Sequence, residues 1–467
     1  MLPDVALLAT FDFCVDERGL SWRALVHVCR TWRNVVFGSP RRLGLRLYYN
    51  TITPVREALD VWPSLPIIIN SYDSFRGRSM GNLIATLEYN DRICELDLIL
   101  RKSRLNQTLE AMQRPFPSLA YLRICTDYDE VPFDPVPASF LGGFAPRLQT
   151  LDLERIQFPG LPKLLLSATD LVTLSLVDIH PSGYISPEAL VTSLSGLTRL
   201  DKLDFRFFEF THSFPDLESP YTPPRTRTLL PALTELRLQT SSEYLEDFVA
   251  RIDAPLLDNL IIIFLDELIS DTPQINQFIG RAPNFEAYDN AQIIFADRMG
   301  GSSVILLKGS IRLELEIKCW SPEQLPSLVQ ACSSSFPQAL IANLRCLYIL
   351  ADSPPDDNTE IGQWIDLLRP FTGVMRLYMH SEFGPYIPLA LQGLVGESVT
   401  ELLPALRSLF LEIPEKERGK EWEEEEEEEE ESLQGIQDAI GKFVAARQLA
   451  GHPISFYPWD EPKAEYY

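Results

Sequence analysis

The side chains that could do chemistry in this sequence recur at one position of a repeating pattern. Each stands between two large apolar residues, so on a strand it would face away from them. In the first part of the chain this position is mostly polar, and its residues are Asp97, Arg123, Asp152, Ser175, Asp204 and Arg237. In the last part it is aromatic, and its residues are Tyr348, Tyr378 and Phe410. Exposed aromatic side chains often anchor protein interfaces, so we expect these three to contact a protein partner.

The alternative for these three aromatic residues is an internal one. The C-terminal tail contains further aromatic residues at Phe456, Tyr457 and Trp459. If this tail folds over the aromatic positions, their role is to pack the end of the domain. Both interpretations follow from the sequence.

Catalytic and metal-binding patterns are missing from the sequence. There is no Gly-x-Ser-x-Gly elbow, no P-loop and no His-Glu-x-x-His motif. The five histidines are dispersed, and the cysteines lack the Cys-x-x-Cys spacing of a metal site; they are Cys14, Cys29, Cys94, Cys125, Cys319, Cys332 and Cys346. We therefore predict no catalytic residue, no cofactor and no metal, and expect the cysteines to be reduced and mostly buried.

The elements that would position the recurring residues are strands of a repeat. The spacing Leu-x-x-Leu-x-Leu returns ten times from Ile93 to Leu411, with room for two degenerate copies near Phe285 and Leu313. Counting these two, the mean interval is about 28 residues, within the range of leucine-rich repeats. Helical segments such as 187–194 and 244–252 lie between the strands. The sequence predicts an α/β fold, an irregular leucine-rich-repeat solenoid with a curved parallel sheet.

The first forty residues have the apolar spacing of helices instead. Leu7, Leu8 and Phe11 form one stripe, and a second runs through the segment from Ser21 until Gly38-Ser39-Pro40 ends it. Two helices of this size are too small to be stable alone. We expect them to pack on the following repeats or on a partner.

This helical segment resembles an F-box, the module that docks on the Skp adaptor of Skp-cullin-F-box ubiquitin ligases. The residues that carry the resemblance are Leu2-Pro3-Asp4, Leu7-Leu8, Phe11 and 28–33 (Val-Cys-Arg-Thr-Trp-Arg). Segments 37–43, 244–247 and 254–258 are similar to the expanded F-box-like families of mushroom-forming fungi. The resemblance implies that the adaptor contacts Leu2, Pro3, Leu7, Leu8 and Phe11, with Val28, Cys29 and Trp32 in the same module.

The resemblance implies that this chain is the substrate-recognition subunit of such a ligase. The Skp adaptor would connect it to a cullin scaffold, and the repeats would bind a protein substrate that the sequence does not identify. An alternative is a leucine-rich-repeat scaffold outside any ubiquitin ligase, in which the same eight residues pack the helices as a cap on the repeats. In the cap, Leu7, Phe11 and Trp32 would turn inward, whereas a docking module would expose an apolar patch.

The charge and the composition of its segments predict the kinds of partner, the location and the organisation of the chain. The net charge of −25 argues against a nucleic-acid partner. No secretory signal or membrane-spanning stretch is visible, so we expect an intracellular protein of the cytoplasm or nucleus, with no membrane contact. The expected organisation is an F-box-like module (1–40), the solenoid (41–414), an acidic disordered loop (415–431) that contains nine consecutive glutamates, and a terminal helix and strand with a tail (432–467).

Overall fold

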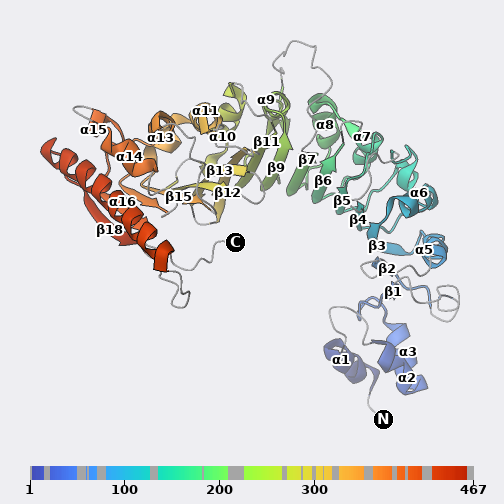
Figure 1. Ribbon diagram of the computed structural model, residues 1–467. Helices are drawn as coiled ribbons and strands as arrows, with labels where there is room; N and C mark the ends of the chain where they lie inside the picture. The colour runs from blue at the N-terminus through green and yellow to red at the C-terminus, as the bar shows by residue number, and fades with distance from the viewer. Residues whose placement is uncertain are drawn as a thin grey trace. The chain divides into compact units, whose positions relative to one another are not determined.

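The computed structural model of the chain forms two compact units, Met1–Pro220 and Tyr221–Tyr467 (Figure 1). It describes residues 3–14, 22–49, 59, 63–70, 80–126, 135–180, 183–208, 226–265, 271–285, 288–296, 301–308, 310–317, 325–351, 361–380, 386–394, 398–412 and 423–459. Leu2, one of the predicted adaptor contacts, lies outside these residues.

The N-terminal module consists of three helices, α1 (Asp4–Cys14), α2 (Trp22–Val28) and α3 (Arg30–Gly38). The sequence predicted one helical segment from Ser21, whereas the structure breaks it at Cys29. Cys29 has an extended backbone, and its Sγ accepts a hydrogen bond from the Trp32 backbone N–H at 3.5 Å. Arg33 Nε donates to the carbonyl of Val26 at 2.9 Å. These two bonds therefore satisfy a backbone carbonyl at the end of α2 and a backbone N–H at the start of α3.

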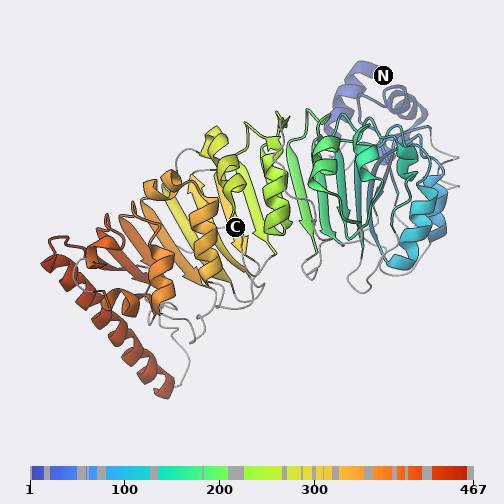
Figure 2. The ribbon, with the colours of Figure 1, turned by 90° about the horizontal axis from the view of Figure 1, so that it is seen from above.

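The described residues of unit 1 form seven parallel strands in chain order. They are β1 (Leu47–Tyr49), β2 (Ile67–Asn70), β3 (Ile93–Leu100), β4 (Tyr121–Thr126), β5 (Thr150–Glu154), β6 (Thr173–Ile179) and β7 (Lys202–Phe207). The helical elements between them are α5 (Met80–Leu87), α6 (Lys102–Ala111), η2 (Phe140–Gly143), α7 (Leu161–Leu165) and α8 (Pro187–Leu194). The helices α5 to α8 lie on one side of the strands (Figures 1 and 2).

Unit 2 begins with the same alternation and changes in the middle. Its first elements are β8 (Thr228–Leu229), β9 (Glu235–Thr240), α9 (Ser242–Ala250), β10 (Ile252–Asp253), β11 (Asn259–Phe264), α10 (Pro273–Arg281) and η4 (Pro283–Phe285). A three-stranded segment follows, with β12 (Asn290–Ala296), β13 (Gly301–Lys308) and β14 (Ile311–Ile317). β8 and β10 form a small separate parallel pair.

The three-stranded segment replaces the two degenerate repeat copies expected near Phe285 and Leu313. The strand order is β11-β14-β13-β12-β15, so β14 pairs with β11, and β12 pairs with the next repeat strand. β13 is antiparallel to both of its neighbours. A short connection can join antiparallel strands, so no helix is needed between them.

Parallel repeats resume after this segment and continue to the end of unit 2. The elements are α11 (Leu325–Ser335), α12 (Gln338–Asn343), β15 (Cys346–Ala351), α13 (Ile361–Leu368), β16 (Arg376–Met379), α14 (Tyr386–Gln392), α15 (Ser398–Glu401) and β17 (Ser408–Glu412). Helix α16 (Glu423–Leu449) and strand β18 (Ser455–Trp459) follow. Helix α16 includes Glu423–Glu431, so this part of the acidic run is helical, in contrast to the loop predicted through residue 431.

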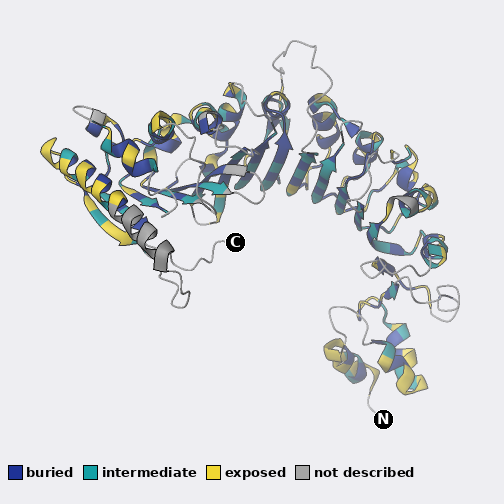
Figure 3. Cartoon of the chain, in the orientation of Figure 1, coloured by how far each residue is buried: buried dark blue, intermediate teal, exposed yellow. Residues whose placement is uncertain are grey.

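The predicted repeat residues form the core of both units. In all ten Leu-x-x-Leu-x-Leu copies, each of the three apolar side chains is no more than 3% exposed. The last two of each triad lie on a strand, and the residue between them is on the opposite face. In Figure 3 the strands accordingly contain both buried and half-buried residues. The mixed α/β architecture with a mostly parallel sheet is therefore that of an irregular leucine-rich-repeat array.

Candidate functional site

The aromatic residues predicted to contact a partner are stacked on one another in unit 2. Tyr348, Tyr378 and Phe410 are direct neighbours on β15, β16 and β17, and we call these three the aromatic ladder. Tyr457 of β18 lies opposite Phe410 and extends the stack. Ring centroids are 4.4 Å apart for Tyr348 and Tyr378, 4.4 Å for Tyr378 and Phe410, and 5.3 Å for Phe410 and Tyr457. The sequence placed the first three at equivalent positions, and the strand register brings them into contact.

The aromatic ladder lies on the face opposite the buried leucines. Tyr348, Tyr378 and Phe410 are half-buried, and Tyr457 is 46% exposed. Parallel rings at this spacing hold one another in place, with part of each side chain left to meet another molecule. Such preordered aromatic side chains lose little conformational entropy on binding.

A second row of side chains borders the aromatic ladder. They are His380, Glu412 and Trp459, which stand two residues beyond Tyr378, Phe410 and Tyr457 and share their face. His380 Nε2 lies 3.4 Å from Glu412 Oε2. The Trp459 ring is 5.3 Å from Tyr378 and 6.1 Å from Tyr348, tilted by 64° and 56°. The C-terminal strand therefore covers part of the ladder, which is the alternative that the sequence left open.

The N-terminal module positions most of the predicted adaptor contacts in two different environments. Leu7 and Phe11 are buried, and the Phe11 ring packs edge-on against Trp32 at 4.8 Å. Leu8 and Trp32 are half-buried, whereas Pro3, Val28 and Cys29 are exposed. The inward residues hold the three helices together, and the outward residues are free to meet a partner.

Two further apolar side chains of this module are exposed and were not among the predicted contacts. Val5 is 73% exposed and Phe13 is 92% exposed, while Val28 of α2 is 59% exposed. Val5, Ala9 and Phe13 follow the i, i+4, i+8 spacing of one helix face, and all three are exposed. This spacing is visible in the sequence, although it lies beside the stripe of Leu7 and Phe11 that packs inward.

Comparisons with known proteins find only low sequence and structural similarity. No protein-family model matches the chain, and no curated protein matches it. Two solved structures that match are the TLR13–ssRNA13 complex, at 13% identity and a TM-score of 0.29, and the leucine-rich repeat-containing protein LegL7 from Legionella pneumophila, at 11% identity and a TM-score of 0.26. The first match covers 77% of this chain and 44% of the TLR13 chain, less than half of its length; the second covers 84% and 97%.

The equivalent face of unit 1 is mostly polar, and three of its side chains bind one another. Asp97, Arg123, Asp152, Ser175 and Asp204 form one row across β3 to β7. Ser175 Oγ donates to Asp152 Oδ1 at 2.9 Å, and Arg123 Nε lies 3.3 Å from Asp152 Oδ2. Burial raises the pKa of the Asp152 carboxyl above its usual range. The middle of this row, Arg123, Asp152 and Ser175, is held in internal contacts, which makes the aromatic ladder the stronger candidate for a partner.

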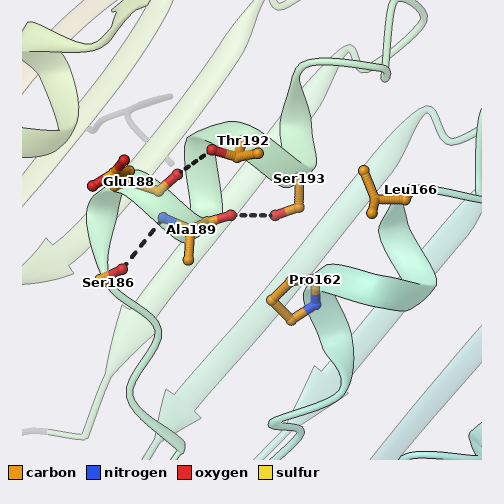
Figure 4. A pocket seen from close by; sticks show the side chains of 7 residues that line it. All are labelled: Pro162, Leu166, Ser186, Glu188, Ala189, Thr192 and Ser193. Atoms are coloured by element: carbon orange, nitrogen blue, oxygen red, sulfur yellow. Dashed lines mark hydrogen bonds between the residues drawn. The ribbon is translucent and has the colours of Figure 1, made fainter. Parts of the chain in front are cut away.

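The hydroxyl groups that line a pocket between α7 and α8 are used in hydrogen bonds within α8 (Figure 4). Its polar lining residues bond to their own helix: Ser186 Oγ accepts from the Ala189 N–H, Thr192 Oγ1 donates to the Glu188 carbonyl, and Ser193 Oγ donates to the Ala189 carbonyl. Pro162 and Leu166 form the apolar side. These hydroxyl groups stabilise the helix and its start.

The remaining reactive groups are dispersed. Within the described ranges, no group of three or more His, Cys, Asp or Glu side chains could hold a metal ion, and no helix is long and apolar enough to cross a membrane. Six cysteines are free thiols: Cys14 and Cys29 are exposed, Cys94 and Cys125 are half-buried, and Cys332 and Cys346 are buried. The expectation that most cysteines are buried is therefore wrong for the described part of the chain, and Cys319 lies outside it.

Proposed function

We propose that this protein is a protein-binding repeat scaffold whose aromatic ladder contacts the partner. The observation that carries the proposal is the stack of Tyr348, Tyr378 and Phe410 on the face away from the helices, partly exposed at three successive repeats. Tyr and Trp are enriched among residues that dominate binding free energy. A stack of rings held by the strands provides such anchors in a fixed arrangement.

The test compares the proteins captured by three tagged full-length variants from the same source. The first is the wild type, the second carries Tyr348→Ala, Tyr378→Ala and Phe410→Ala, and the third carries Tyr121→Ala, an aromatic residue on the equivalent face of unit 1. We expect one set of proteins to be lost only with the triple variant. Identical sets for all three folded variants contradict the proposal.

In its finer form, the proposal is that the chain is the substrate-recognition subunit of a Skp-cullin-F-box ubiquitin ligase. The support is the F-box-like pattern together with exposed apolar side chains on the helical module, Val5, Phe13 and Val28. The Skp adaptor would bind this module, and the repeats would hold the substrate near the ubiquitin-conjugating enzyme. The scaffold without a ligase remains the second candidate, because Leu7 and Phe11 turn inward as a cap requires.

Purified Skp adaptor separates these two candidates. The full-length wild type should capture the adaptor, and a Val5→Asp/Phe13→Asp variant should lose at least tenfold in affinity, since two exposed apolar contacts become charged. Asn34→Asp is the control, because it adds a charge at an exposed position of the same module. No capture by the folded wild type supports the scaffold outside a ligase.

A further inference from the structure

Strand β18 is held less firmly than the helix that precedes it. Among the residues that the structure describes, it pairs with one neighbour, β17, and each of its five residues is exposed or half-buried. In α16, by contrast, Ile436, Ile440, Phe443 and Arg447 are all buried. An edge strand with few buried side chains opens at a low free-energy cost, while the helix stays in place.

β18 presents two aromatic side chains to the aromatic ladder at the spacing i, i+2. Tyr457 continues the stack beyond Phe410, and Trp459 reaches Tyr378 and Tyr348 across the ladder. The backbone of β18 runs parallel to β17 with Tyr457 opposite Phe410. The chain's own last strand therefore combines strand pairing with aromatic contacts on this surface.

We propose that the β17 edge and the aromatic ladder form a binding site for an extended peptide segment with aromatic side chains at i and i+2. β18 occupies this site until such a segment of a partner protein displaces it. The inference deepens the proposed function and rests on it, because it defines the kind of partner that the ladder accepts. Strand addition supplies backbone hydrogen bonds, and the ring contacts select the sequence.

Pro458 is consistent with a strand that can be exchanged. Proline lacks an N–H and occurs on edge strands, so no further strand can pair fully with the outer side of β18. The missing N–H lies on the side away from β17, because the Ser455 N–H, three residues earlier, donates to the Arg407 carbonyl on the β17 side. β18 therefore keeps its backbone donors toward β17 and has the character of an edge strand.

The experiment removes the aromatic contacts of β18 by substitution, giving a variant that we call the emptied protein, and supplies the β18 sequence as a separate peptide. The probe is a fluorescent synthetic peptide with the sequence of residues 454–459 (Ile-Ser-Phe-Tyr-Pro-Trp). Full-length protein carrying Tyr457→Ala and Trp459→Ala should bind it at least about tenfold more tightly than the wild type, as expected from two aromatic contacts. Ser455→Ala, an exposed residue of the same strand, should behave as the wild type.

Two further variants identify the surface. A peptide in which alanine replaces the residues that correspond to Tyr457 and Trp459 should not bind. Adding Tyr378→Ala to the emptied protein should abolish binding of the original peptide. Thermal unfolding of each variant establishes that it is folded. Equal affinities for the wild type and the emptied protein overturn the inference, and so does a wild type that exchanges β18 between two copies in solution.

The outcome is distinguishable from failure of the proposed function. If the triple ladder variant loses its partner proteins but the emptied protein does not bind the peptide, the scaffold proposal stands and strand exchange is wrong. If the peptide binds as expected and the triple variant keeps all captured proteins, the ladder binds β18 alone and the scaffold uses another surface.

Discussion

Burial separates the cysteines of this chain into reactive and unreactive thiols. Burial raises the pKa of Cys125 to about 12, and Cys125 also donates to Glu154 Oε2 at 3.0 Å. Burial raises the pKa of Cys332 to about 12 as well. Because the thiolate is the reactive form, we predict that brief iodoacetamide treatment at pH 8 modifies exposed Cys14 and Cys29 and leaves Cys125 and Cys332 intact.

Mass spectrometry of the native protein measures these rates residue by residue. The same treatment in concentrated urea is the control, since unfolding exposes every thiol and should remove the differences. Labelling of Cys125 as fast as Cys14 in the native protein would show that the half-buried thiol is more accessible than its contacts indicate.

A single carboxylate joins two successive repeats of unit 2. Glu246 of α9 accepts hydrogen bonds from the backbone N–H groups of Gln274 at 2.9 Å and Ile275 at 2.8 Å, at the start of α10. Glu246→Gln replaces one acceptor oxygen by a donor, so one buried N–H loses its partner. We predict a loss of about 1 kcal/mol in stability, measured as a lower urea midpoint. Glu243→Gln, exposed on the same helix, should leave the midpoint unchanged.

At the level of elements, Arg447 fixes α16 against the preceding repeat. Its side chain is fully buried and donates to the carbonyls of Val399, Leu402, Leu403 and Leu406 at 2.9 to 3.4 Å. We predict that Arg447→Met costs at least about 2 kcal/mol, because the buried carbonyls lose their donor. Hydrogen exchange in 399–406 and 436–449 should become faster. Exposed Lys442→Met is the control, and equal exchange in the two variants would refute the role of Arg447.

The elements also show how far the sequence determines the fold. All ten apolar triads are buried as their spacing predicted, because alternation on a strand is a local property. The exchanged order of β12, β13 and β14 was not predicted, since it depends on which strands pair over long distances. Alternating apolar residues look the same in a parallel and an antiparallel strand, so the pattern around Leu313 was compatible with a degenerate repeat.

The candidate site was predictable to a similar degree. Equivalent positions in three repeats placed Tyr348, Tyr378 and Phe410 in one row, which the strand register confirms. Trp459 stands on β18, outside the repeat pattern, and its contact with Tyr378 depends on how the last strand joins the sheet. In the N-terminal module, the sequence identified the stripe that includes Leu7 and Phe11 but not the neighbouring exposed face of α1, because both faces contain apolar residues.

At the level of the whole molecule, a destabilising core substitution in an array of repeats should affect mainly the repeats next to it. In such arrays each repeat contacts mainly its neighbours, so stability is a sum of local terms. Leu122 in β4 and Leu377 in β16 are equivalent core residues, each fully buried and each paired on both sides by parallel strands. Leucine-to-alanine changes at such positions typically cost about 2–5 kcal/mol.

We predict that these two changes accelerate hydrogen exchange in different parts of the chain. Leu122→Ala should affect β3, β4 and β5, and Leu377→Ala should affect β15, β16 and β17, with each variant serving as the control for the other. Only the second change should also weaken a partner bound to the aromatic ladder, because Tyr378 is the next residue on the same strand. If both changes accelerate exchange throughout the protein by the same amount, the chain unfolds as one cooperative body and local stability does not govern its binding surface.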